Sequence, residues 1–297
     1  MGAGAFRGHR RGSLIAWLLP FWAAWLLIGL LLPVHEAKVL RERLELELMR
    51  WRWGGGPPPA RAAVAVAGWP RVILHAGGSV ASWTGTNARE ALDANYAAGG
   101  RAFELDFEWT TDEALVAVHN PPGVTLQQFR QNQQGRPLTN LALAEVGDWF
   151  ARHSGAMLVT DVKARNVEAL TRMRGLFPGW ESRIVPQIYS LWELEPVKRL
   201  GYTRVILTLY LHGYFFPTVE EFLAIAPVDA LTIPVNRAER TALERLASWS
   251  VPVYCHTVND ESESCRLRDI GAWGVYSDTL RAPWTNGWPG LPGPEAP

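Results

Sequence analysis

Cysteine is scarce in this sequence, and neither sign of charge is in excess. The chain of 297 residues contains two cysteines, Cys255 and Cys265, and its 29 basic residues balance its 29 acidic residues. Two cysteines cannot build a disulfide framework or a zinc cage on their own, and we expect them to be free and partly buried rather than bridged or catalytic. No basic stretch is interleaved with aromatic residues, so nucleic acid is not an expected partner.

The longest uncharged stretch of the sequence lies near the N-terminus. Residues 14–33, LIAWLLPFWAAWLLIGLLLP, have the length that a helix needs to cross the hydrocarbon core of a membrane. A cleaved signal peptide and a buried helix are the alternatives, but the run is longer than a signal peptide usually has, and no small-x-small cleavage site follows it. We therefore expect a retained transmembrane anchor after a basic tail at residues 1–13.

The charges around this stretch do not give a clear orientation. Three arginines precede it, and five basic residues follow it closely, so the positive-inside rule does not favour a cytoplasmic N-terminus. A short basic tail before a first span is nevertheless typical of a signal anchor. We expect a single-pass membrane protein whose C-terminal domain is extracytoplasmic, with the membrane as a partner through the N-terminal helix.

A stalk and a linker are predicted at residues 34–60, after the apolar stretch. Residues 36–53 place mixed charges between leucines and other good helix formers, which predicts either a solvated helical stalk or a segment lying along the bilayer surface. The composition of GGGPPPA at 54–60 is that of a linker. At the other end of the chain, residues 282–297 are rich in proline and glycine and predict an irregular tail.

Short β-rich runs alternate with helical patterns between the linker and the tail. Residues 87–99 and 237–248 are examples of the helical patterns, and they are long enough for crossover helices. This alternation predicts an α/β fold with a parallel sheet, and eight strands predict a closed (β/α)8 TIM barrel, which we place at residues 61–281. A run at 114–119 predicts an extra strand or hairpin arm. The eight barrel-strand candidates are residues 71–76, 102–109, 156–163, 183–189, 204–210, 229–235, 251–258 and 273–278.

Polar residues gather near the ends of these predicted strands. The C-terminal ends of the strands and the loops that follow them form the active site of a TIM barrel, so polar side chains there suggest chemistry. They are His75, Glu104, Asp106, His119, Asp161, Lys163, Gln187, Tyr189, Tyr210, His256, Asn259 and Asp278.

Three of these residues predict a metal site. Glu104 and Asp106 lie on one face of their strand because side chains alternate with a period of two, and Asp161 on the neighbouring strand adds a third carboxylate. Three converging carboxylates repel one another unless a cation neutralises them, and an all-oxygen site suits Mg²⁺ or Ca²⁺ better than Zn²⁺. The alternative is a structural ion pair of these acids with Lys163 and no metal.

Two histidines flank the carboxylate strand. Imidazole exchanges protons near neutral pH, so His75 and His119 suggest a base and an acid, although a lone histidine is more often structural. The other histidines outside the N-terminal tail lack such company: His35, His153 and His212 are expected to be structural or on the surface. His256 either supports the site from behind or lines it.

The motifs resemble a known family in their order along the chain. ILHAGG, TNAREALDANYAAGG, FELDFEWTTDEALVAVHN, VTDVK, PQIYS, HTVND and GVYSD, which cover nearly all of residues 71–279, resemble the glycerophosphodiester phosphodiesterase branch of the phospholipase C-like phosphodiesterases. The family pattern has His-Arg-Gly at the first strand, then Glu-Asn-Thr, Glu-x-Asp on the second strand, His-Asp after it and Glu-x-Lys on the third. The resemblance implies that His75 and His119 are the acid/base pair, that Glu104 and Asp106 bind metal, and that Lys163 contacts phosphate.

The sequence departs from the family pattern at several positions. Ala76 stands in place of the arginine, Asn87 alone of Glu-Asn-Thr is kept, Asn120 replaces an aspartate, and the third ligand is Asp161 rather than glutamate. Losing the arginine removes a bidentate phosphate contact. In having an aspartate as third ligand and a short span between His119 and Asp161, the sequence is similar to the related sphingomyelinase D-type enzymes. The resemblance therefore predicts the substrate only as a class.

These observations together predict a metal-dependent phosphodiesterase. We expect hydrolysis of glycerophosphodiesters or related lipid-derived phosphodiesters by histidine acid/base catalysis, with the roles of the two histidines left open. A lysophospholipase D or sphingomyelinase D-like lipid phosphodiesterase is one alternative. A catalytically inactive barrel that binds phospholipid is another. The expected substrate-binding residues are Lys163, Asn87, Gln187, Tyr210 and His256.

Overall fold

A computed structural model describes residues 33–53, 68–132, 137–226 and 228–281 of the chain. The chain divides into two units, Met1–Leu48 and Met49–Pro297. Helix α2, Val34–Trp53, begins in the first unit and covers the stretch for which the sequence predicts a helical stalk. Within it, Lys38 lies 4.0 Å from Glu42 and Arg41 lies 3.1 Å from Glu45, one turn apart along the helix.

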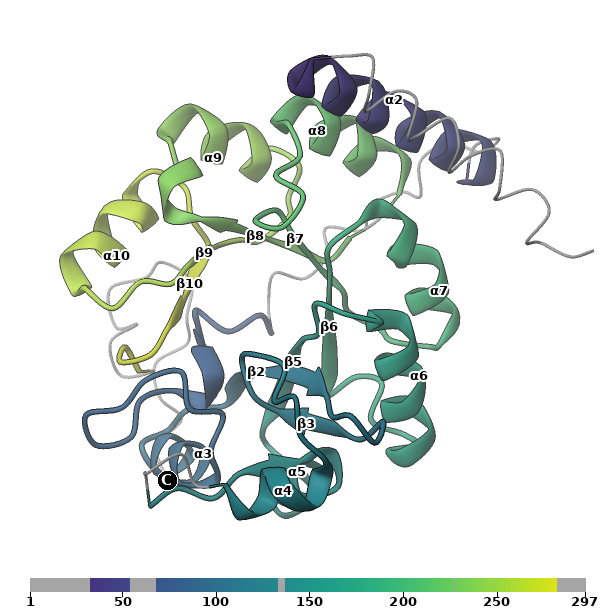
Figure 1. The fold of residues 1–297 in the computed structure, drawn as a ribbon. Coiled ribbons are helices and arrows are strands. Elements are labelled where there is room, and N and C mark those ends of the chain that lie inside the picture. Colours follow the sequence, from purple (N-terminus) through teal and green to yellow (C-terminus); the bar gives the residue numbers. More distant parts are fainter. Residues whose placement is uncertain (1–32, 54–67, 133–136, 227, 282–297) are drawn as a thin grey trace, which may run out of the picture. The chain divides into compact units, whose positions relative to one another are not determined.

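The second unit contains a closed barrel of eight parallel strands (Figure 1). Around the barrel the order is β1, β2, β5, β6, β7, β8, β9 and β10, and β10 pairs with β1 to close it. The TIM barrel predicted from the strand and helix pattern is therefore confirmed, and each predicted strand contains an observed one. The barrel strands are β1 Val72–Leu74, β2 Ala102–Trp109, β5 Met157–Asp161, β6 Ile184–Ile188, β7 Ile206–Thr208, β8 Ala230–Pro234, β9 Val253–His256 and β10 Gly274–Ser277.

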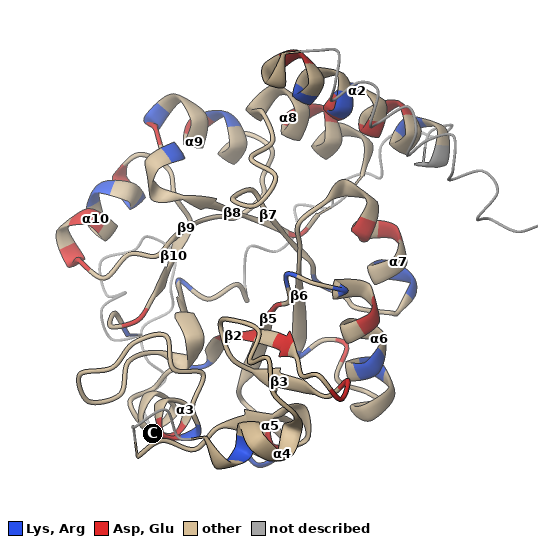
Figure 2. Cartoon of the chain, in the orientation of Figure 1, with Lys and Arg blue, Asp and Glu red and all other residues tan. Residues whose placement is uncertain are grey.

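Helices follow the strands and surround the barrel (Figure 1). Helix α5 shows why they pack there, because Val146, Trp149 and Phe150 form a buried stripe at helical spacing while the polar residues of the helix point elsewhere. Figure 2 shows that charged residues lie mostly on these helices, whereas strand β2 of the barrel also carries acidic residues. The helices of the barrel unit are α3 Arg89–Ala97, α4 Leu126–Gln131, α5 Leu143–Arg152, α6 Asn166–Leu176, α7 Leu194–Arg199, α8 Phe216–Ile225, α9 Arg240–Ala247 and α10 Glu261–Asp269, with short 3₁₀ turns η1 His75–Gly77, η2 Leu191–Glu193 and η3 Val235–Arg237.

An apolar layer fills the barrel interior toward the N-terminal ends of the strands, and every barrel strand contributes one residue to it. Trp69 and two partly buried residues, Met157 and Trp273, pack against this layer. Alternation along a strand points these side chains inward and their direct neighbours outward, toward the helices. The layer consists of Ile73, Ala102, Val159, Val185, Ile206, Ala230, Tyr254 and Tyr276, all buried.

A small antiparallel arm extends from the second barrel strand. Strand β3, Leu115–Ala117, pairs with the upper part of β2, and a two-residue strand β4, Leu141–Ala142, pairs with β3. The sequence predicts β3 but not β4. Buried Val116, Phe129 and Ala142 hold the arm against helix α4. The arm returns the chain to the end of β2, where the backbone N–H of Val118 donates a 3.0 Å hydrogen bond to the carbonyl of Asp106.

No helix within the described ranges combines the length and the apolar character that a membrane span requires, and this finding corrects the expected single-pass membrane localisation. Apart from Pro33, the predicted anchor at 14–33 lies outside the described residues, as do the tail at 1–13, the linker at 54–60 and the tail at 282–297. Cys255 is free and buried and Cys265 is free and partly buried, as predicted.

Candidate active site

The candidate site is a polar layer that lies one step above the apolar layer of the barrel. Residues two positions further along each strand point to the same interior, because side chains alternate. Each of these positions is polar, although the layer beneath is apolar. The layer consists of His75, Glu104, Asp161, Gln187, Thr208, Thr232, His256 and Asp278.

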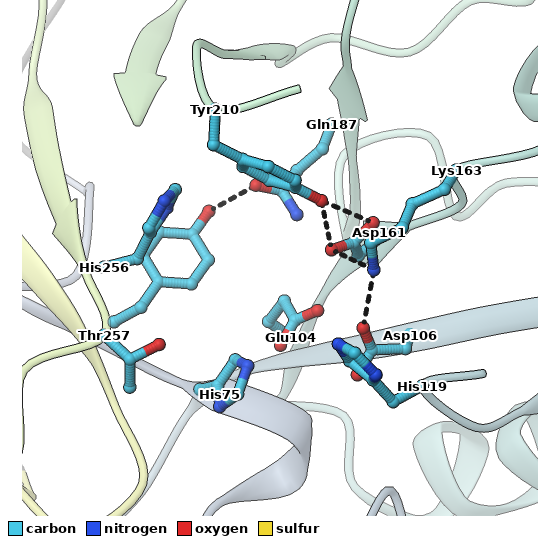
Figure 3. Close-up of a pocket in the computed structure, with 11 residues that line it drawn as sticks. His75, Glu104, Asp106, His119, Asp161, Lys163, Gln187, Tyr210, His256 and Thr257 are labelled. Atoms are coloured by element: carbon cyan, nitrogen blue, oxygen red, sulfur yellow. Dashed lines mark hydrogen bonds and ion pairs between the residues drawn. The ribbon is translucent and has the colours of Figure 1, made fainter. Parts of the chain in front are cut away.

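A pocket of about 160 Å³ opens above this layer, at the C-terminal ends of the strands. Figure 3 shows its residues converging from several strands. Every residue predicted to be catalytic, to bind metal or to bind substrate lines the pocket except Asn87, and Thr257 and Tyr276, which the sequence did not suggest, line it as well. The other polar residues at predicted strand ends, Tyr189, Asn259 and Asp278, are not part of the lining. The barrel thus brings together residues that are far apart along the chain.

The register of two neighbouring strands explains why three carboxylates meet. Strands β2 and β5 run parallel, and Asp106 lies directly beside Asp161 in their ladder, while Glu104 is two residues earlier on β2. One carboxylate oxygen from each residue lies within 4.8 Å of the others, and all three side chains are buried. Such a cluster is unfavourable unless a cation balances its charge.

Glu104 provides the test of whether these residues suit a metal ion. Its Oε2 accepts a 2.8 Å hydrogen bond from the backbone N–H of Ala76. Its Oε1 is buried and has no hydrogen-bond partner in the described part of the chain. Burial and the neighbouring charge of Asp106 raise the pKa of Glu104 well above its usual value. An oxygen that is buried, unpartnered and beside two other carboxylates fits an ion held by oxygen ligands.

Lys163 partly balances the acidic cluster. Its ammonium nitrogen lies 3.1 Å from Asp106 Oδ1 and 3.1 Å from Asp161 Oδ2. Burial lowers the pKa of Lys163, but the charges of Asp161 and Asp106 outweigh burial and raise it, so this residue stays protonated. The ion pair that the sequence offered as an alternative to a metal site is therefore present, but it does not include Glu104. The positive charge near Glu104 is that of His75, which is already hydrogen-bonded to Asp278.

Asn87 supports the site from outside the pocket. Its Nδ2 donates a 3.0 Å hydrogen bond to Asp106 Oδ2, and the backbone N–H of Asp106 donates one of 3.0 Å to its Oδ1. Asn87 is buried and adopts a left-handed backbone conformation with φ of 52°, which asparagine tolerates better than most residues. The structure thus places it against a candidate metal ligand, although the sequence suggested that it binds substrate.

His75, which follows β1, is oriented by the carboxylate of Asp278, which follows the neighbouring strand β10. Its Nδ1 lies 2.8 Å from Asp278 Oδ1, and Asn259 Nδ2 donates a 2.7 Å hydrogen bond to the other oxygen of Asp278. A carboxylate only accepts, so Nδ1 carries the proton and Nε2 is left for the pocket. Burial lowers the pKa of His75, but the hydrogen bond to Asp278 and the charge of Glu104 raise it, to about 9.

His119 lies at the mouth of the same pocket. It follows the antiparallel arm, it is exposed, and it lines the pocket together with Asp106 (Figure 3). The pocket therefore has one imidazole held by a carboxylate and a second that is open to solvent.

Two tyrosine hydroxyls also donate hydrogen bonds to the carboxylate of Asp161. Tyr189 follows β6 and donates to Asp161 Oδ1, and Tyr210 follows β7 and donates to Asp161 Oδ2 at 3.0 Å. Both phenols have raised pKa values, because of burial first and the charge of Asp161 second. They therefore act as neutral hydrogen-bond donors.

Gln187 and His256 line the remaining wall. The hydroxyl of Tyr276 donates a 3.1 Å hydrogen bond to Gln187 Oε1. His256 Nδ1 lies 2.9 Å from the hydroxyl oxygen of Thr232. Burial, together with the nearby charge of His75, lowers the pKa of His256 to about 4. This imidazole is neutral at pH 7 and can offer hydrogen bonds but no charge.

Tyr189, Asp278 and Tyr276 were not assigned a role in the site from the sequence, although a signal for each was present. Tyr189 and Asp278 belong to the polar residues at predicted strand ends, and Tyr276 lies two positions before Asp278 on the same face. Their partners decide their importance, and the sequence does not show those partners.

Comparisons with known proteins support the resemblance at the level of the fold. No family model and no curated protein matches the chain, but many solved structures do. A glycerophosphodiester phosphodiesterase of Thermotoga maritima is 17% identical with a TM-score of 0.57, and the match covers 71% of this chain and 95% of that one. A glycerophosphoryl diester phosphodiesterase of Parabacteroides distasonis is 12% identical with a TM-score of 0.56, covering 73% and 87%.

A third structure contains a bound molecule. It is an Oleispira antarctica phosphodiesterase in complex with its product sn-glycerol-3-phosphate, 16% identical with a TM-score of 0.56, and the match covers 70% of this chain and 93% of that one. At these identities the likeness shows the fold. The barrel is that of the glycerophosphodiester phosphodiesterase structures, as the motifs predict.

Proposed function

We propose that this chain is a divalent-metal-dependent phosphodiesterase that hydrolyses glycerophosphodiesters or related lipid-derived phosphodiesters. The observation that carries the proposal is the buried Oε1 of Glu104, which has no hydrogen-bond partner in the described ranges. This atom shares a pocket with two further carboxylates and with His75 and His119. The fold of the phosphodiesterase structures supports the same reaction class.

Glu104, Asp106 and Asp161 are the residues that hold the ion in this proposal. Their oxygens suit Mg²⁺ or Ca²⁺. When bound, such an ion supplies Lewis-acid stabilisation of the charge on the phosphoryl oxygens. The arrangement also explains why the chain tolerates three acids here, since a cation relieves the burial cost of Glu104.

His75 and His119 move the protons. Because Nδ1 of His75 is bound to Asp278, Nε2 is the atom that gives or takes a proton in the pocket. One imidazole removes the proton of the attacking hydroxyl as its oxygen bonds to phosphorus. The other protonates the leaving alcohol as its bond to phosphorus breaks. If the attacking hydroxyl belongs to the substrate, as the family resemblance implies, the first product is a cyclic phosphate.

The substrate contacts come from pocket residues other than His75 and His119. Lys163 supplies the positive charge for the phosphate, and Tyr210, Gln187 and neutral His256 supply hydrogen bonds from residues that line the pocket. Asn87 acts indirectly, through Asp106. In this proposal, the loops around the pocket mouth contact the part of the substrate beyond the phosphate.

A phosphodiester panel tests the proposal. Purified full-length chain is incubated with glycerophosphocholine, glycerophosphoethanolamine and glycerophosphoglycerol, with Mg²⁺, with Ca²⁺ or with EDTA, and products are read by mass spectrometry. We expect turnover that EDTA abolishes and that falls by about 10²–10⁴-fold in His119→Ala and in His75→Ala. Unchanged turnover in both variants, or full activity in EDTA, would contradict the proposed chemistry.

The position of Ala76 favours a second candidate. Its side chain is fully buried where the family pattern has an arginine, so no guanidinium reaches the phosphate from this position. A lysophospholipase D or sphingomyelinase D-like activity on lipid phosphodiesters is compatible with this loss and with Asp161 as a ligand. Choline or ethanolamine release from lysolipid or sphingolipid, without turnover of the soluble panel, would support it. Binding of metal and phospholipid without any turnover would instead support an inactive binding barrel.

A further inference from the structure

The third carboxylate of the candidate metal site, that of Asp161, accepts hydrogen bonds from three side chains. Tyr189 donates its hydroxyl to Asp161 Oδ1, while Tyr210 and Lys163 both donate to Oδ2, at 3.0 and 3.1 Å. Figure 3 shows Tyr210 and Lys163 approaching Asp161 from within the pocket. Without Tyr189, Oδ1 would keep only the longer contact of 3.4 Å from Tyr210, and the shorter contacts of Tyr210 and Lys163 would both pull on Oδ2.

The two tyrosines occupy different environments. Tyr189 is 2% exposed and does not line the pocket, whereas Tyr210 lines it and is only partly buried. The rings meet edge to face with their centroids 6.0 Å apart. Tyr210 can therefore also reach a bound substrate, but the hydroxyl of Tyr189 is directed at Asp161.

The backbone of Tyr189 is fixed as well. Its N–H donates a 2.6 Å hydrogen bond to Glu193 Oε2. Glu193 also accepts from the N–H of Ser190, and Ser190 caps the start of the 3₁₀ turn η2 in return. Tyr189 is thus anchored at both ends, by Glu193 at the backbone and by Asp161 at the hydroxyl.

We propose that Tyr189 is a positioning residue for the metal ligand Asp161. Its hydroxyl fixes the carboxylate against the sideways pull of Lys163, so that Asp161 stays turned toward Glu104 and Asp106. Groups that orient a metal ligand in this way commonly contribute about 10–100-fold in metal affinity. The inference rests on the proposed metal dependence and adds a residue that neither the metal cluster nor the pocket lining contains.

Removal of one oxygen atom tests the inference. Tyr189→Phe and wild-type protein, stripped with EDTA and dialysed, are titrated with Mg²⁺ and with Ca²⁺ in a calorimeter. We expect Kd to rise by at least about tenfold in the variant, and the Mg²⁺-induced rise in Tm to shrink accordingly. Tyr202→Phe is the matched control, because the Tyr202 hydroxyl is buried and donates to the carbonyl of Leu170, away from the site; its metal affinity should not change.

The outcomes separate this inference from the proposed function. A wild-type protein that binds neither ion overturns both. Metal binding by the wild type with equal affinity in Tyr189→Phe overturns the positioning role alone. If Tyr189→Phe yields too little folded protein, Glu193→Ala, which removes the acceptor that anchors the backbone N–H of Tyr189, is titrated in the same way. A weaker affinity is expected there too, and an unchanged one overturns the inference.

Discussion

Asp106 and Asp161 lie side by side in the ladder of strands β2 and β5, and the ammonium of Lys163 lies 3.1 Å from an oxygen of each. The charges of two buried carboxylates are thus bridged by one cation, while Glu104 shares the charge of His75 with Asp278. The candidate site is electrostatically incomplete in a way that a divalent ion would correct.

Lys163→Met should destabilise the metal-free protein. The change leaves Asp106 and Asp161 without their shared cation, at a cost of about 1–3 kcal/mol, below the range for fully buried pairs because 28% of the Lys163 side chain is exposed. Thermal unfolding in EDTA measures the loss, and saturating Mg²⁺ should recover part of it.

Lys198→Met is the control for this prediction. The side chain of Lys198 is similarly exposed, at 25%, and its ammonium nitrogen lies 2.7 Å from Asp229 Oδ2. Neither residue lines the pocket. Its variant should lose stability to the same extent with and without Mg²⁺. If Mg²⁺ changes the stability loss of both variants equally, then no bound ion replaces the positive charge of Lys163 beside Asp106 and Asp161.

Glu104→Gln should stabilise the metal-free protein while abolishing metal binding. The pKa of Glu104 is raised in the folded state, so the folded protein retains a proton that the unfolded chain releases, and stability falls as pH rises above about 4.3. The amide removes this loss. In EDTA at pH 8 we expect a Tm above that of the wild type by a few degrees, at about 2–4 °C per kcal/mol.

The pH dependence of this effect provides its check. The Tm difference between Glu104→Gln and the wild type should shrink toward pH 5, where the carboxyl group keeps its proton more easily. A Glu104→Gln variant that is less stable than the wild type at every pH would show that Oε1 is satisfied in solution. In Mg²⁺ the order should reverse, because only the wild type gains binding energy.

Asp278→Asn should weaken both stability and turnover through His75. The pKa of His75 is raised to about 9, with burial opposing and Asp278 contributing, so the pair stabilises the fold below about pH 6.5 and that stabilisation is lost as pH rises through 9. In EDTA the Tm deficit of the variant should be largest near pH 6 and small at pH 10. Turnover should fall on the order of 10²-fold.

The pH–rate profile distinguishes orientation from general destabilisation. Without the carboxylate the pKa of His75 decreases, so the limb of the profile that belongs to this group should move to lower pH. Asp269→Asn removes an exposed carboxylate that pairs with Arg268 outside the pocket and should leave the profile unchanged. A lower rate with the wild-type profile would assign Asp278 a purely structural role.

Gly78→Ala should disturb the loop that carries His75. Gly78 has φ of 86°, and a Cβ there would lie 2.6 Å from Nδ2 of Asn95, which donates to the carbonyls of Gly77 and Ser79. Backbone strain and the clash together should cost roughly 2–4 kcal/mol. Gly85→Ala, with φ of 64° and open space around it, should cost only about 1 kcal/mol. Urea unfolding compares the two, and equal losses would contradict the role of the Asn95 contact.

Periodicity was enough to predict the barrel and most of the candidate site. Each strand is a short run of β-formers, and alternation within it assigns Glu104 and Asp106 to one face without knowledge of their neighbours. The position of His119 follows from the arm after β2. For these residues the local pattern and the topology of a parallel barrel carry enough information.

Contacts that depend on long-range register were not predictable in this way. His75 and Asp278 meet only because β10 closes the barrel on β1, and Tyr189 reaches Asp161 through the relative height of β5 and β6. Asn87 faces Asp106 instead of the pocket because its left-handed backbone turns it inward. Strand β4 is only two residues long and leaves no periodic signal.

The step from the apolar layer to the polar layer of the barrel has a consequence for engineering. The apolar layer and the polar layer are separated by two residues on every strand. Polar-layer side chains such as Gln187, Thr208 and Thr232 can therefore be varied without changing the apolar layer. The apolar residues two positions earlier on the same strands are Val185, Ile206 and Ala230. A library restricted to Gln187, Thr208 and Thr232 should therefore sample new substrate preferences at little risk to folding. The opposite library, restricted to the apolar layer, should yield mostly insoluble protein.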